Sequence, residues 1–121
     1  MTRFLFASIL IPSLSVAAPY DGVYKQTANA DCGLVGADGA AVEIREGIFF
    51  GVEIQCRMTR PVNVVDMEAT LYTMQCSGTG QNWTERAMVM RRADAAGIIM
   101  LWDGYAFVYD ACEQPSNQTS E

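Results

Sequence analysis

The stretch "LWDGYAFVYDAC", residues 101–112, decides the fold class of this chain. Its Asp103-Gly104 pair is a strong signal for a two-residue β-turn, because glycine accepts the left-handed backbone conformation that such turns require. Apolar residues alternate on both sides of this pair, with the period of two that is typical of β-strands. Together with the preceding apolar residues from Ile98 onward, the stretch predicts an antiparallel hairpin.

The two faces of this predicted hairpin differ. One face carries Trp102, Tyr105, Phe107 and Tyr109, and the other carries small and aliphatic residues together with Cys112. Only one face of a barrel wall packs on the core, and the sequence leaves open which face that is. If the aromatic face is the outer one, it requires a cover, which is the N-terminal segment, a second copy of the chain or a protein partner.

The remaining chain shows short alternating segments and no long helical period. We therefore predict an all-β fold, a small antiparallel meander of about seven strands that closes into a barrel or a compact sandwich. Residues 27–39 are rich in glycine, alanine and aspartate and are predicted to form a loop. The predicted strands outside the hairpin are residues 20–26, 42–45, 48–56, 69–76 and 83–92.

The clearest of these strands is 48–56. Its even-numbered residues are all apolar, which predicts that they form the core face. The preceding loop is predicted as Arg45-Glu46-Gly47, with Ile44 opposite Ile48. A two-residue loop would place the charged Arg45 opposite Ile48.

The amino-terminal residues 1–17 predict a cleaved signal peptide. Arg3 supplies a positive start, the apolar run that follows is too short to span a bilayer, and small residues precede the cleavage site after Ala17. Residues 18–112 then form one domain with no stable membrane insertion. The polar segment 113–121 is predicted to be a disordered tail.

Four cysteines, Cys32, Cys56, Cys76 and Cys112, fit an exported domain with two disulfides. No two of them have the close spacing that zinc sites favour, so a metal site is not expected. Four cysteines allow three pairings, and spacing alone does not choose among them. We take the sequential pairing, Cys32–Cys56 and Cys76–Cys112, as the prediction.

The chain lacks histidine, which excludes Ser-His and Cys-His catalysis. Its formal net charge of −6 disfavours nucleic acid as a partner. We expect no enzymatic activity, cofactor or metal. Four methionines (Met74, Met88, Met90 and Met100) are predicted to fill the core, with binding of Cu(I) by their thioethers as the alternative.

The segment "LYTMQCSGTGQNWTERAMVM" contains Leu71-Tyr72, Cys76, Gly78, Gly80, Trp83 and Arg86 in an order that resembles a family of exported proteins. These are small, uncharacterised, cysteine-paired β proteins of the Alphaproteobacteria. The closing "YAFVYDAC" and the opening "YDGVYKQ" fit the same group. The resemblance implies a periplasmic location and no catalytic residues.

These observations favour a non-enzymatic exported module, periplasmic or secreted, that binds or inhibits a target. The alternative is a structural or accessory protein of the envelope. A Cu(I) carrier and a small hydrolase are less favoured. The candidate recognition residues, predicted to lie on the surface, are Trp83, Trp102, Tyr105, Phe107 and Tyr109.

Overall fold

The structure is a computed structural model that describes residues 18–113. The predicted signal peptide (1–17) lies outside the described residues, as does the predicted tail apart from Glu113. Residues 18–113 contain no helix of the length and apolarity that a membrane crossing requires. They form nine strands: β1 (Gly22–Lys25), β2 (Asp31–Val35), β3 (Ala40–Arg45), β4 (Ile48–Gly51), β5 (Ile54–Asn63), β6 (Ala69–Gly78), β7 (Gln81–Arg91), β8 (Gly97–Trp102) and β9 (Ala106–Ala111).

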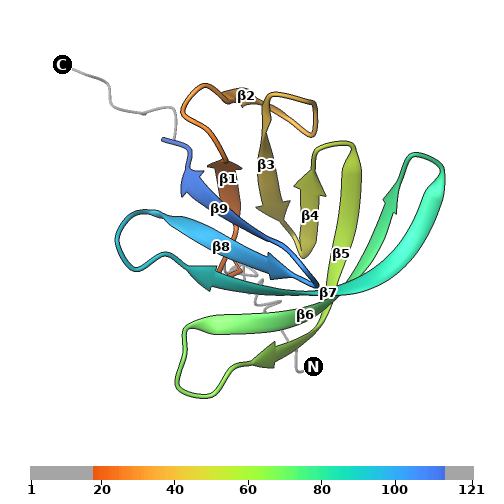
Figure 1. Cartoon of the computed structure of the whole chain (residues 1–121), viewed down its shortest axis with the longest axis vertical. Coiled ribbons are helices and arrows are strands. Elements are labelled where there is room, and N and C mark those ends of the chain that lie inside the picture. The colour runs from red at the N-terminus through yellow and green to blue at the C-terminus, as the bar shows by residue number, and fades with distance from the viewer. Residues whose placement is uncertain (1–17, 114–121) are drawn as a thin grey trace, which may run out of the picture.

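Eight of the strands close into an antiparallel barrel. Neighbours run in the order β1, β9, β8, β7, β6, β5, β4, β3, and pairing of β1 with β3 closes the ring. The extra strand, β2, runs parallel to β3. In Figure 1, β5, β6 and β7 are the long, curved strands, and the hairpin of β6 and β7 projects at the right of the molecule. The predicted all-β meander is confirmed, and it closes as a barrel. It has nine strands within residues 18–113 where about seven were predicted, because residues 48–56 are divided between two strands and β2 lies in the predicted loop.

One end of the barrel is packed by tyrosines. The Tyr20 hydroxyl lies 3.1 Å from Thr70 Oγ1, and the Tyr24 hydroxyl donates a 2.6 Å hydrogen bond to the Tyr20 carbonyl. The ring of Tyr20 also meets the edge of Tyr72. Above this layer, Met74 and Met100 are fully buried in the barrel, so these two methionines do fill the core as predicted.

The predicted single strand 48–56 is wrong. It is divided by a tight turn at Val52-Glu53, after which β5 begins at Ile54. Gly51 allows this turn because a Cβ there would lie only 2.8 Å from Phe49 Cε1. The residues on either side of the turn therefore belong to two neighbouring strands.

The predicted loop and core face of β4 are also wrong. Arg45 pairs with Ile48 across a two-residue turn, in which Glu46 and Gly47 have φ angles of 53° and 76°. Two positive φ angles define the turn type that best matches the twist of a hairpin. The inner face carries Phe49, whose exposed fraction is 2%. Phe50 faces outward, where the Arg45 guanidinium lies 4.9 Å from its ring centroid.

Both disulfides form, but the predicted sequential pairing is wrong. The bonds are Cys56–Cys76 and Cys32–Cys112. Because β5 starts at Ile54, Cys56 lies near its beginning and directly opposite Cys76 on β6, with Cα atoms 4.0 Å apart. Cys32 lies in β2, inside the segment predicted to be a loop, and this strand brings it to Cys112.

Candidate binding cavity

The hairpin of β8 and β9 has the register that a two-residue turn at Asp103-Gly104 implies. Ile98 lies opposite Tyr109 and Met100 opposite Phe107, and the Trp102 N–H donates a 2.8 Å hydrogen bond to the Tyr105 carbonyl across the turn. The aromatic face is the inner one, which answers the question that the sequence left open. The aliphatic face is the outer one, and Val108 there is half-exposed.

The five aromatic residues predicted to lie on the surface therefore do not form an exposed stripe on the outside of the barrel. Trp102 and Tyr109 are each only 5% exposed, whereas Tyr105 is 48% exposed. Phe107 and Trp83 are half-buried and pack against the core. Four of the five residues nevertheless lie together, because they line one cavity inside the barrel.

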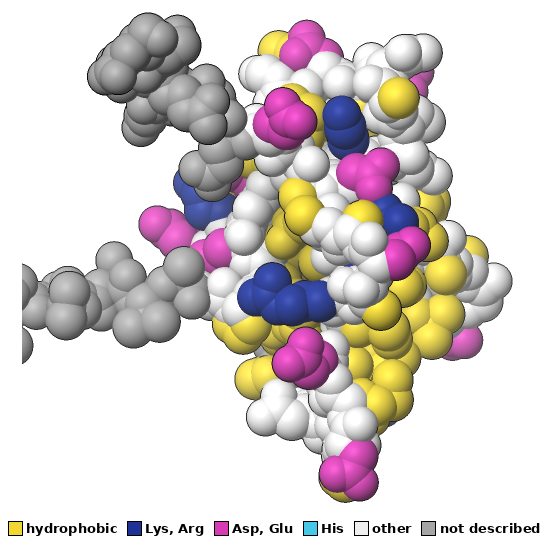
Figure 2. Space-filling model, turned by 90° about the vertical axis from the view of Figure 1, so that its left-hand side faces the viewer, with side chains coloured by type: hydrophobic (Ala, Val, Ile, Leu, Met, Phe, Trp, Pro, Cys, Tyr) yellow, Lys and Arg dark blue, Asp and Glu magenta, His cyan; other side chains and the backbone are white. Residues whose placement is uncertain are grey.

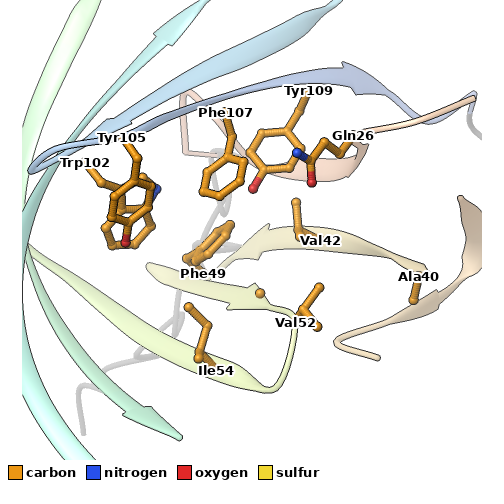
Figure 3. A pocket seen from close by; sticks show the side chains of 11 residues that line it. Gln26, Ala40, Val42, Phe49, Val52, Ile54, Trp102, Tyr105, Phe107 and Tyr109 are labelled. Carbon is orange, nitrogen blue, oxygen red and sulfur yellow. The ribbon is translucent and has the colours of Figure 1, made fainter. Parts of the chain in front are cut away.

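This cavity of about 350 Å³ lies at the end of the barrel opposite Tyr20. Figure 3 shows two facing walls, with the aromatic residues of β8 and β9 on one side and residues of β3, β4 and β5 on the other. None of its lining residues is charged. They are Gln26, Ala40, Val42, Phe49, Gly51, Val52, Ile54, Trp102, Tyr105, Phe107 and Tyr109.

Five aromatic rings in this lining form a continuous chain of contacts. Trp102 and Tyr105 stack with centroids 6.1 Å apart and planes 9° from parallel. Tyr105 meets Phe107 edge-on at 5.6 Å, and Phe107 meets Tyr109 at 5.8 Å. Phe49 joins from the opposite wall, 5.8 Å from Trp102. Such offset and edge contacts hold the rings in place, so the packing of the rings with one another fixes the shape of this wall.

Two polar groups in this wall are notable. Burial raises the pKa of the Tyr109 hydroxyl to about 12, with a further contribution from Tyr105. Burial in the wall thus disfavours the charged phenolate form of Tyr109. The indole Nε1 of Trp102 is buried, and no side chain or carbonyl of residues 18–113 accepts its hydrogen.

A carboxylate lies beside the aromatic wall. Glu85 accepts hydrogen bonds from Trp83 Nε1 at 2.7 Å and from the Tyr105 hydroxyl at 3.3 Å. Burial, followed by the charge of Glu85, raises the pKa of Tyr105. Trp83 therefore has a positioning role, since it holds the carboxylate next to a lining residue.

Sequence reasoning missed Phe49 and Glu85. Phe49 was missed because the face of β4 was inverted. Glu85 could have been found from the sequence, because it shares the inward face of β7 with Ala87 and Val89, both buried. An acidic residue in register with core positions is uncommon and needs a partner.

The described residues do not gather a metal site. Within 18–113, no three side chains of histidine, cysteine, aspartate or glutamate are grouped to hold a metal ion. Met88 and Met90 alternate with the buried Ala87 and Val89 and so lie on the outer face of β7, whereas Met74 and Met100 are inside. The four methionines therefore do not form one cluster, and the outer pair does not fill the core as predicted.

Comparison with known proteins gives no match: no protein-family model, curated protein or solved structure is similar to the chain.

Proposed function

We propose that this protein is an exported, non-enzymatic binding protein that holds a small, largely apolar molecule in the barrel cavity. The cavity itself carries this proposal. Its volume of about 350 Å³ lies in the range of small-molecule sites, and such sites are mostly apolar and aromatic with a few polar groups. An eight-stranded barrel has room inside for its own side chains or for one small ligand.

The unpartnered indole of Trp102 supports a ligand at this wall. A buried donor without an acceptor costs about 1–3 kcal/mol of stability. Proteins tend to break such folding rules at functional sites. The unpartnered indole of Trp102 therefore lowers the stability of the fold but leaves a hydrogen-bond donor for a ligand.

The two disulfides support a location outside the reducing cytoplasm, because such bonds persist in oxidising compartments. Together with the predicted signal peptide, they favour the periplasm or the extracellular space. The absence of histidine supports a binding role over a catalytic one.

The test is titration of the full chain with N-phenyl-1-naphthylamine, a neutral dye whose emission rises in apolar surroundings. We expect saturable binding of one dye per chain. Ile54→Trp should weaken it by filling the cavity from β5, and Val52→Trp tests the same wall from an exposed turn. Val108→Trp, on the outer face of β9, is the matched control and should leave binding unchanged.

Thermal unfolding establishes that each variant is folded before it is titrated. The absence of saturable dye binding to the folded wild-type protein would contradict the proposal. Equal binding by the wild-type protein and both folded cavity variants would contradict it as well.

An accessory role in the envelope is the second candidate, and the outer face of β8 and β9 favours it. Leu101 is 45% exposed and Val108 51% exposed, and Figure 2 shows apolar side chains gathered over part of one side of the molecule. Crosslinking in intact cells should then capture a partner or a second copy, and Leu101→Lys should abolish the capture. Crosslinking that is unchanged in this variant would exclude this face as the contact.

A further inference from the structure

We infer that the cavity selects a lipophilic cation, a molecule with a quaternary ammonium group on a compact apolar body. This inference rests on the proposed function, since it names the chemical class of the ligand for the same cavity. It follows from the aromatic lining, the Glu85 carboxylate hydrogen-bonded to it, and the uncharged character of the lining itself.

The aromatic lining provides an attraction that distinguishes a cation from a neutral molecule. Phe49, Trp102, Tyr105, Phe107 and Tyr109 contribute five rings to one small space. A cation within about 6 Å of such a ring is attracted by the negative face of the π system, and several rings around one site form the cage that recognises quaternary ammonium groups. An alkylated ammonium also has fewer hydrogen bonds to water to lose on burial.

The Glu85 carboxylate beside the lining reinforces this preference. Glu85 accepts a hydrogen bond from the Tyr105 hydroxyl, and with Asp103 and Arg86 it borders a second hollow that shares Trp102 with the cavity. A carboxylate beside a low-dielectric opening raises the local concentration of cations.

No basic side chain competes for this position within the lining. Lys25 precedes the lining residue Gln26, but it alternates with the buried Tyr24 and so turns outward, in register with Asp110. A bound anion would have no cation to pair with in the lining and would lie near the Glu85 carboxylate, and burial of an unpaired charge is costly. A neutral ligand would gain neither the aromatic nor the acidic attraction.

The test uses two probes of the same shape. Benzyltrimethylammonium and neopentylbenzene differ only in having a positively charged nitrogen or a neutral carbon at the branching atom. Each is used to displace N-phenyl-1-naphthylamine from the full chain. We expect the cation to bind about ten-fold more tightly, as cation–π attraction at a desolvated site predicts.

Glu85→Gln tests the contribution of this carboxylate. The amide oxygen can still accept from Trp83 Nε1 and the amide NH2 can donate to the Tyr105 hydroxyl oxygen, but the charge is removed, so the affinity for the cation should fall about three-fold while that for the neutral probe is unchanged. Glu43→Gln is the matched control, because this residue lies on the outside of β3 beside Arg45.

The outcomes separate the inference from the proposed function. Dye binding with equal or tighter binding of neopentylbenzene overturns the cation preference and leaves the binding cavity standing. Tighter binding of phenylacetate, an anion of similar size, also overturns the preference. The absence of any dye binding instead contradicts the proposed function itself.

Discussion

At the scale of single residues, two side chains are held in states that they would not adopt in the unfolded chain. Tyr109 keeps its hydroxyl in the cavity wall, where burial raises its pKa to about 12 from 10.0. Thr79, in the turn between β6 and β7, has a left-handed φ of 47°, which is rare for a β-branched residue. Each of them gives a prediction.

Tyr109→Phe should make the protein more resistant to alkali. A raised pKa means that folding favours the neutral phenol, so its stabilising contribution is complete below pH 10 and is lost as the pH rises through about 12. Circular dichroism during alkaline titration should show unfolding at higher pH in the variant. Tyr105→Phe, at a half-exposed position, should shift the midpoint less. A midpoint that is identical in wild type and Tyr109→Phe would contradict this account.

Thr79→Asn should stabilise the protein by about 1 kcal/mol, because asparagine tolerates the left-handed conformation and Asn-Gly is a preferred turn pair. Gly80, which follows, already has a φ of 74°. Urea unfolding measures the change. Thr84→Asn, within regular β7, is the control and should be neutral or destabilising. A gain of the same size at both positions would assign the effect to composition and not to the turn.

At the scale of elements, the hairpin of β8 and β9 could be predicted and the hairpin of β4 and β5 could not. The Asp103-Gly104 pair marks the turn of the β8–β9 hairpin, because this residue pair favours two-residue turns, and the alternation of apolar residues fixes the register of its strands. In β4, Phe49 and Phe50 are both apolar, so alternation cannot say which one is buried. In the turn after β4, Glu53 has a φ of 56°, a conformation for which glycine or asparagine is the usual residue.

The candidate site, too, could be predicted only in part. The four aromatic residues around the Asp103-Gly104 turn are functional candidates from the sequence alone, because such a group around one turn is conspicuous. Their orientation was not predictable, since both faces of that hairpin are apolar and only the closed barrel decides between them. Phe49 reaches the cavity through a contact between strands distant in sequence, 5.8 Å from Trp102, and no local pattern reports such a contact.

A glycine at the start of β8 provides a prediction about element pairing. A Cβ on Gly97 would overlap the carbonyl oxygen of Tyr109 on the neighbouring strand. Gly97→Ala should therefore destabilise the protein by about 3 kcal/mol, by forcing the two backbones apart. Gly39→Ala is the control, since Gly39 has a φ of 76° with open space around it, and it should cost about 1 kcal/mol. If Gly97→Ala and Gly39→Ala lowered the stability measured by thermal unfolding equally, the predicted overlap with the Tyr109 carbonyl would not be costly.

At the scale of the whole molecule, the barrel has one short seam. β1 has four residues and meets β9 at two register positions and β3 at three. The Cys32–Cys112 disulfide spans this seam, and the Cys112 N–H donates a 2.8 Å hydrogen bond to the Val23 carbonyl. One wall of the cavity includes β9 and the other includes β3, and β1 lies between these two strands, so the walls meet across the seam.

Removal of this disulfide in Cys32→Ala/Cys112→Ala should destabilise the protein by about 4 kcal/mol, because the bond closes a loop of 80 residues. It should also weaken dye binding and speed hydrogen exchange in β1. Cys56→Ala/Cys76→Ala removes a bond of separation 20 within one hairpin and should not speed exchange in β1 beyond its general loss of stability. Exchange in β1 that is equally fast in both folded variants would contradict the role of the seam.

The nested disulfide pattern has a consequence for biogenesis. A chain threaded through a membrane from its amino terminus presents Cys32 first and its partner Cys112 last. An oxidant that joins thiols in order of arrival would make two wrong bonds, Cys32–Cys56 and Cys76–Cys112. For a chain exported as proposed, we therefore expect correct maturation to depend on reshuffling by an isomerase. A host without that enzyme should accumulate the Cys32–Cys56 form in a non-reducing peptide map, and a native map there would show that Cys32 waits for the last strand.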